Sequence, residues 1–184
     1  MTAPIWLVRH GEASASWGEH PDPGLSSLGH QQAEASALSL VASIPKNAQL
    51  ISSPKQRAQA TARPLAERFQ CPVAIDPVFD ELVSPVALAD RPRWLTTFMG
   101  QTWHEQSAEV LSWRDGIIKR LEAVQTPSII FCHFMVINAV VAALRDHSAT
   151  VQFWPDNGSI HEFVVNKQGL QLVSLGQEMP TRIN

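Results

Sequence analysis

Short apolar runs alternate with longer segments of helical spacing along most of the chain, and this alternation limits the possible folds more than any other sequence feature. Four runs are predicted as strands from their length and β-forming side chains, at residues 3–8, 48–52, 72–75 and 127–132. Four segments are predicted as helices, at residues 26–43, 53–69, 107–124 and 135–146. Ser53 is the predicted N-cap of the second helix, with Pro54 at its first position.

Strands that alternate with helices usually pair in parallel, and the helices then cover both faces of the sheet. The last part of the chain differs, because residues 159–165 and 170–175 flank a turn around Gly169 and predict an antiparallel hairpin. The predicted fold class is therefore α/β, a three-layer sandwich with a mostly parallel central sheet and an antiparallel edge hairpin.

The domain organisation follows from the length of the chain. A chain of 184 residues suits one domain, predicted over residues 1–184. At about residues 80–106 prolines and tryptophans replace the regular spacing, and this stretch is predicted as an insertion or cap over the main layers.

Composition excludes several classes of function. Hydrophobic residues make up 45% and charged residues 17%, as in ordinary globular proteins, and the net charge of −3 argues against a nucleic-acid partner. No apolar run approaches the roughly 20 residues that cross a bilayer, so no membrane partner is predicted. The N-terminus lacks a basic region followed by a signal core, and Cys71 and Cys132 make no disulfide framework. We therefore predict a cytoplasmic protein.

Arginine and histidine side chains follow three of the predicted strands. Arg9 and His10 follow the first strand, Arg57 lies one turn into the helix after the second, and His133 follows the strand that ends in "SIIFC". Carboxyl ends of parallel strands meet at one crevice, so these four side chains are expected to converge. Such a cluster repels itself unless an anion fills it, and the arginine fork and a helix N-terminus both suit a phosphoryl group.

The same cluster contains a candidate nucleophile. Neighbouring cations favour the neutral imidazole of His10, which is the form that attacks phosphorus. A leaving oxygen needs a proton, and Glu81, after the third strand, is the acid best placed by chain order, with Asp80 as the first alternative. The arginines supply the positive charge, so no metal and no cofactor are predicted.

Five stretches in the same order resemble the motifs of the histidine phosphatase superfamily. "LVRHGEA" resembles its Arg-His-Gly motif, and "DPGLSSLGHQQA" and "ISSPKQRAQATA" resemble its next two signatures. "IIFCHF" occupies the place of its second histidine, and "NGSIHEF" resembles its late strand. The resemblance implies a phosphoglycerate mutase-like fold. It implies His10 as the phosphorylated nucleophile, Glu81 as the proton donor, and Arg9, Arg57 and His133 as phosphate ligands.

The chain departs from the family pattern at several positions of the predicted site. Phe134 stands where glycine usually follows the second histidine. Ser16, a candidate phosphate-binding residue through its hydroxyl, replaces an asparagine that is frequent in the first loop. The usual pattern around the glutamate is missing, so Glu81 and Asp80 remain competing acids. Trp17, His20 and Phe134 are candidate pocket walls, although aromatic residues of this kind are as often part of the core.

Three functions are compatible with these residues. The leading hypothesis is a phosphomonoester hydrolase that acts on a small-molecule phosphoester through a phosphohistidine. A phosphoglycerate-mutase-type phosphotransferase is the first alternative, because the same cluster can return the phosphoryl group to an acceptor. A catalytically weak module that binds a phosphorylated ligand is the second. The oligomeric state, a homodimer included, is left open.

Overall fold

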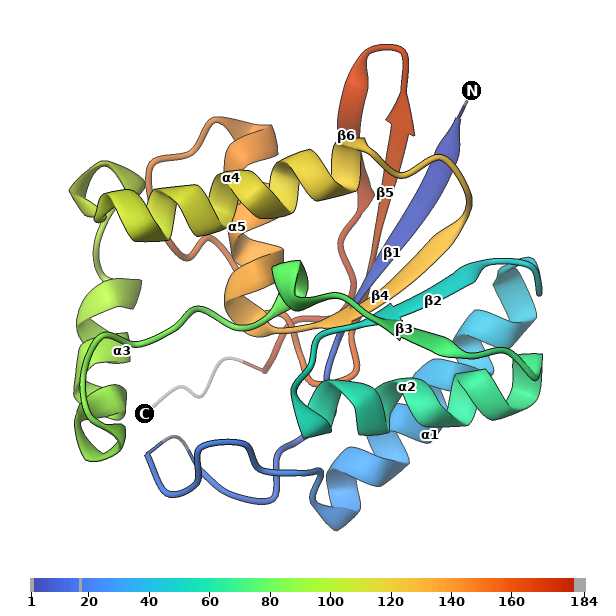
Figure 1. The fold of residues 1–184 in the computed structure, drawn as a ribbon, viewed down its shortest axis with the longest axis horizontal. Coiled ribbons are helices and arrows are strands. Elements are labelled where there is room, and N and C mark those ends of the chain that lie inside the picture. The colour runs from blue at the N-terminus through green and yellow to red at the C-terminus, as the bar shows by residue number, and fades with distance from the viewer. Residues whose placement is uncertain (1, 17, 181–184) are drawn as a thin grey trace.

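The computed structural model describes residues 2–16 and 18–180. Six strands form one sheet in the order β3-β2-β4-β1-β5-β6 (Figure 1). The strands are β1 (Ala3–Arg9), β2 (Gln49–Ser52), β3 (Val73–Ile75), β4 (Ser128–Cys132), β5 (Ile160–Asn166) and β6 (Gly169–Ser174). The α-helices of the described residues are α1 (Ser27–Ser43), α2 (Gln56–Phe69), α3 (Arg91–Met99), α4 (Ala108–Glu122) and α5 (Phe134–Arg145).

The sheet is parallel over its first four strands and antiparallel at one edge. β4 pairs in parallel with both β1 and β2, and β3 pairs in parallel with β2. β5 is antiparallel to β1 and to β6. The predicted fold class is therefore confirmed, and each predicted strand and helix lies within three residues of its observed bounds.

Helices cover both faces of the sheet because apolar side chains alternate along the strands. In β1, Ile5 and Leu7 pack into the core under α4 and α5, whereas Trp6 and Val8 pack toward α1 and α2. β4 divides in the same way, since Ile130 faces the first core and Ile129 the second. The two pairs of helices lie on opposite sides of the sheet in Figure 1. This period of two produces the three layers.

Residues 80–106, the predicted insertion, contribute no strand to the sheet. They form two single-turn helices, Leu88–Asp90 and Trp103–Glu105, with α3 between them. Phe98 and Trp103 are buried against residues of α5 in a third hydrophobic cluster. This packing holds α3 away from the sheet, beside the end of the molecule that carries the predicted site (Figure 1).

The predicted start of the second helix is wrong by two residues. α2 begins at Gln56 with Lys55 as its N-cap, not at Ser53 and Pro54. The Ser53 hydroxyl instead lies 2.7 Å from His133 Nε2, and it accepts a hydrogen bond from the Lys55 N–H. The Ser53 N–H donates to the Phe131 carbonyl and continues the β2–β4 ladder. Pairing with β4 therefore outweighs the local capping preference of serine.

Two glycines allow the loop after β1 to touch α1. A Cβ atom on Gly29 would overlap the Glu12 carbonyl, and one on Gly11 would overlap the Gly29 carbonyl. The Ser26 N–H donates to the Glu12 carbonyl at 2.9 Å beside this contact. The backbone that follows His10 is therefore held directly against the first turn of α1.

Replacing Gly29 with alanine is expected to lower the free energy of unfolding by about 1–3 kcal/mol, because a backbone carbonyl cannot turn aside as a side chain can. Urea unfolding followed by circular dichroism measures the change. Gly116→Ala, within α4, is the matched control, since nothing lies near its added methyl group. That variant is expected to gain about 0.5–1 kcal/mol from helix propensity. Unchanged or increased stability of Gly29→Ala would contradict this account of the contact.

Candidate active site

The ends of three adjacent strands bring the predicted site residues together. β4 lies between β1 and β2, and the backbone links their ends directly. The His10 N–H donates to the Cys132 carbonyl at 3.0 Å, and the Ser53 N–H donates to the Phe131 carbonyl at 3.0 Å. The residues that follow these strands therefore share one edge of the sheet, as the sequence predicted.

The hydrogen bonds of His10 define which ring nitrogen carries its proton. Nδ1 lies 2.7 Å from the Gly11 carbonyl, which only accepts, so Nδ1 is the donor. Nε2 accepts from Arg57 Nε at 3.1 Å and therefore holds a lone pair. Burial lowers the pKa of His10 well below 6.5, and the charges of Arg57 and Arg9 lower it further. The ring is neutral, with Nε2 unprotonated.

His133 lies beside His10 and is fully buried. The two ring centroids are 5.2 Å apart, with the planes at 60°. His133 Nε2 lies 2.7 Å from the Ser53 hydroxyl, and its Nδ1 has no hydrogen-bond partner among the described residues. Burial is the main cause of its strongly lowered pKa, followed by the charge of Arg57. His133 is therefore a neutral, fully buried ring beside His10.

Arg57 is presented by the first turn of α2. Its Nη1 lies 3.8 Å from Asp22 Oδ1, and burial lowers its pKa although Glu81 and Asp22 act in the opposite direction. Thr61 joins this turn to the loop after β1, because its hydroxyl donates to the Arg57 carbonyl and accepts from the Gly11 N–H. The backbones of Arg57 and Gly11 are thus fixed relative to each other.

Arg9 is held by an aromatic stack and a carbonyl group. Its Nη1 donates to the Pro155 carbonyl at 2.7 Å, and its guanidinium lies 5.3 Å from the centroid of the Phe134 ring. Phe134 in turn packs against Trp154 at 5.3 Å. Burial lowers the pKa of Arg9 to about 10, so it stays charged near neutral pH, and its Nε has no partner in the described part of the chain.

The two candidate acids have different surroundings. Glu81 is 6% exposed and lines a cavity, and its Oε1 accepts from the Leu82 N–H at 3.0 Å. Burial raises its pKa above the ordinary 4.5, although Arg57 opposes the shift. Asp80 does not line that cavity. Its Oδ1 accepts from the Glu81 N–H at 2.8 Å, and its Oδ2 lies 3.4 Å from Lys55 Nζ.

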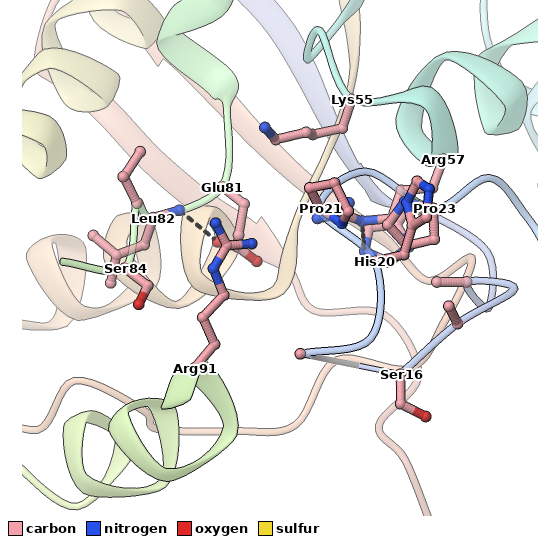
Figure 2. Close-up of a pocket in the computed structure, with 15 residues that line it drawn as sticks. Ser16, His20, Pro21, Pro23, Lys55, Arg57, Glu81, Leu82, Ser84 and Arg91 are labelled. Atoms are coloured by element: carbon pink, nitrogen blue, oxygen red, sulfur yellow. Dashed lines mark hydrogen bonds between the residues drawn. The ribbon is translucent and has the colours of Figure 1, made fainter. Parts of the chain in front are cut away.

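A cavity of about 140 Å³ lies next to His10. Of the residues predicted for the site, five line it, namely His10, Ser16, His20, Arg57 and Glu81. Figure 2 shows Arg57 and His20 on one side of this cavity and Glu81 on the other. Arg9, His133 and Phe134 are not among its lining residues. Phe134 packs against Arg9 instead of forming a wall, and Trp17 lies outside the described residues.

Two cations of the cavity wall were not predicted from the sequence, Lys55 and Arg91. Lys55 directly follows the "SSP" stretch, so its place beside a predicted anion site was a signal that the interpretation did not use. Arg91 belongs to the inserted segment, whose path over the site has no signature in the sequence.

The described residues contain no group of three or more His, Cys, Asp or Glu side chains arranged to hold a metal ion. Within the same residues, each helix is too short or too polar to cross a membrane.

The fold and the strand-end cluster agree with the comparison to family models. The model described as the histidine phosphatase superfamily, branch 1, matches residues 5–178. The chain therefore belongs to the histidine phosphatase superfamily, as its motifs predicted. Comparison with curated proteins gave no match.

Solved structures of similar fold are phosphoglycerate mutase-like phosphatases. A mycobacterial glucosyl-3-phosphoglycerate phosphatase matches with a TM-score of 0.73 and 22% identity, over 97% of this chain and 100% of its own. Its complex with VO3 matches with a TM-score of 0.71 and 21% identity, over 96% and 100% of the two chains. A phosphoserine phosphatase from Entamoeba histolytica matches with a TM-score of 0.73 and 20% identity, over 96% and 98%.

Proposed function

We propose that the protein is a phosphomonoester hydrolase that works through a phosphohistidine on His10. One observation carries the proposal. The Gly11 carbonyl holds the proton of His10 on Nδ1, so the lone pair of Nε2 is left beside Arg57 at the wall of the cavity. A neutral, oriented imidazole next to fixed positive charge is suited to attack phosphorus.

In the first step, His10 Nε2 forms a bond to phosphorus while the bond from phosphorus to the ester oxygen breaks. Arg57 releases the lone pair and turns its N–H groups to the phosphoryl oxygens, which Arg9 and His133 also bind. The leaving oxygen takes the proton of Glu81, and the Gly11 carbonyl stabilises the more positive ring through Nδ1–H. Positive charge aimed at the transferring group is usually the largest part of such catalysis.

In the second step, the Glu81 carboxylate takes a proton from a water molecule. The water oxygen bonds to phosphorus, the bond from phosphorus to Nε2 breaks, and inorganic phosphate leaves. His10 regains its lone pair and Glu81 its proton, so the site returns to its starting state. Arg9 and Arg57 supply the positive charge, and the proposal uses no metal ion.

Glu81 is preferred to Asp80 as the acid in this proposal. Glu81 lines the cavity, and burial keeps more of it protonated than an exposed carboxyl group. The carboxylate of Asp80 already accepts a hydrogen bond from the Glu81 N–H and forms an ion pair with Lys55. Ser16 also lines the cavity, and the proposal gives its hydroxyl the role of a further donor to the phosphoryl group.

The first test of this function is phosphate release from p-nitrophenyl phosphate and from 3-phosphoglycerate, with EDTA present. Release from either compound supports a phosphatase. Conversion of 3-phosphoglycerate to its isomer without release would favour a phosphotransferase. Thermal stabilisation by phosphate with no turnover would favour a binding module. The small-molecule substrate and the cytoplasmic location are parts of the proposal that rest on the sequence.

The proposal sets the direction of the pH dependence. His10 must be unprotonated, so kcat/KM falls when the pH drops below its pKa, which burial and two arginines place well under 6.5. Glu81 must be protonated, so kcat/KM falls as the pH rises through its pKa, which burial places above 4.5. For an alkyl phosphate measured from about pH 4 to 9, we expect the optimum on the acidic side.

In this proposal, the fall of kcat/KM on the alkaline side is caused by deprotonation of Glu81. Glu81→Gln is expected to be slower on the acidic side, where Glu81 of the unaltered protein is protonated, and to lose this alkaline limb. The ionisation of the substrate affects both proteins alike and cancels in the comparison. An alkaline limb that persists in the variant would mean that another group donates the proton.

A further inference from the structure

Asn138 is a buried polar side chain that the proposed mechanism does not use. It is fully buried in α5, where every other residue from Phe134 to Leu144 is apolar. Its Oδ1 accepts hydrogen bonds from the Gln152 N–H at 2.9 Å and from the Phe153 N–H at 3.4 Å. Its Nδ2 donates to the Phe153 carbonyl and to the Phe134 carbonyl, both at 3.2 Å. The amide therefore makes all four of the hydrogen bonds open to it.

The two segments that Asn138 joins are the two that hold the Arg9 guanidinium. Phe134, in the first turn of α5, has its ring centroid 5.3 Å from the guanidinium carbon. The Pro155 carbonyl, at the end of the 152–155 loop, accepts a hydrogen bond from Arg9 Nη1 at 2.7 Å. The distance between this loop and the start of α5 therefore sets the position of the guanidinium.

The backbone of Arg9 is fixed independently of Asn138, because the Arg9 N–H donates to the Ser159 carbonyl at 3.0 Å. A change at Asn138 therefore reaches the side chain of Arg9 and not the strand that carries it. The loop also has a second anchor, since the Met179 N–H donates to the Trp154 carbonyl at 2.8 Å. Loss of the Asn138 contacts is expected to displace the loop without releasing it.

We propose that Asn138 is a positioning residue, which aligns the Arg9 guanidinium with the phosphoryl group by fixing the 152–155 loop against the start of α5. The inference rests on the proposed function, in which Arg9 binds phosphoryl oxygens, and adds the residue that orients this ligand. Buried networks whose hydrogen bonds are all made fix one arrangement of the core around them. The N–H groups of a guanidinium point in fixed directions, so a small displacement weakens their bonds to an anion.

The experiment is a double-mutant cycle with inorganic phosphate as the probe. Asn138→Ser lacks the atoms that reach the 152–155 loop, but its hydroxyl can still donate to the Phe134 carbonyl one turn earlier. We expect the affinity for phosphate, measured by calorimetry, to fall by about 3- to 10-fold. This is part of the roughly 10- to 100-fold loss expected for Arg9→Gln, the range of a hydrogen bond to a charged group. In the Arg9→Gln background, Asn138→Ser should change the affinity by less than about 2-fold.

Ser128→Ala is the matched control for lost stability. Ser128 is fully buried at the start of β4, at the end of the strand away from His133, and its hydroxyl donates to the Thr126 carbonyl at 2.9 Å. Both Ser128→Ala and Asn138→Ser remove a buried hydrogen bond, so both should lower the free energy of unfolding. The affinity of Ser128→Ala for phosphate is expected to stay unchanged.

Asn138→Thr is a second variant, which keeps the donor to the Phe134 carbonyl and fills more of the original volume. It is expected to show the same dependence on Arg9 as Asn138→Ser. An equal loss of phosphate affinity in Ser128→Ala, or failure of both Asn138 variants to fold, would mean that Asn138 serves stability alone and would overturn the inference.

Phosphate binding separates this inference from the proposed function, because it needs no turnover. Coupling between Asn138 and Arg9 in phosphate affinity supports the positioning role even if no ester is hydrolysed, a result that would refute the proposed function alone. Equal effects of Asn138→Ser in the two backgrounds, or no binding of phosphate by the unaltered protein, would overturn the inference. Phosphate release from p-nitrophenyl phosphate would then still support the phosphatase.

Discussion

Replacing His10 with alanine is expected to lower the rate of p-nitrophenyl phosphate hydrolysis by at least about 10³-fold, because the variant lacks the atom that forms the bond to phosphorus. Arg57 and His133 remain in place to bind the phosphoryl group, so the loss should lie in kcat more than in KM. Rapid alkaline quenching of the unaltered protein with labelled substrate should trap a phosphoryl group on protein. That group is expected to be stable to alkali and labile to acid, as the phosphoramidate bond of phosphohistidine is.

The control for this experiment is His30→Ala, since His30 is an exposed histidine on α1 and lies away from the cavity. Full activity and full labelling are expected for it. Equal rates for His10→Ala and the unaltered protein would remove His10 from the mechanism. A label that persists in His10→Ala would place the covalent intermediate on another residue.

Glu81→Gln is expected to slow the hydrolysis of an alkyl phosphate by about 10²- to 10⁴-fold, the usual contribution of a positioned general acid. Glutamine keeps the size of the side chain and an oxygen for the Leu82 N–H, so the fold of the loop is preserved. The first step with p-nitrophenyl phosphate should be slowed less in this variant, because p-nitrophenolate leaves without a proton. Steady-state rates on the two substrates measure this difference.

Asp80→Asn is the comparison that decides between the two carboxyl groups. The variant keeps an oxygen that can accept from the Glu81 N–H, so its effect on the backbone of Glu81 is small. We expect a modest loss of activity that is similar for the alkyl phosphate and for p-nitrophenyl phosphate. A large loss confined to the alkyl phosphate in Asp80→Asn, with little change in Glu81→Gln, would exchange the roles of the two residues.

The sequence predicted the fold well because its elements depend on local patterns. Apolar side chains alternate along β1 and β4, and the predicted strands and helices lie close to their observed bounds. The convergence of His10, Arg57 and His133 followed from one general rule, that parallel strands carry their ligands at their carboxyl ends. That rule needs the order of the elements and no detail of side-chain packing.

The parts that sequence reasoning missed depend on contacts between distant segments. The Ser53 hydroxyl meets His133 instead of capping α2, because β4 lies beside β2. Phe134 was a candidate pocket wall, but its ring contacts Arg9 and Trp154 and does not line the cavity. Arg91 enters the cavity only through the packing of Phe98 and Trp103, which places α3. A local sequence pattern does not predict these contacts, because the residues that form them are far apart along the chain.

The position of β4 within the sheet has a consequence for biosynthesis. β1 and β2 leave the ribosome long before residues 128–132, the strand that lies between them. Until then each of the two early strands has an open edge on that side, and open edges are templates for pairing with other chains. A nascent or truncated chain that stops before β4 is therefore prone to aggregate. Because His133 directly follows β4, the strand-end cluster is complete only after synthesis has passed this strand.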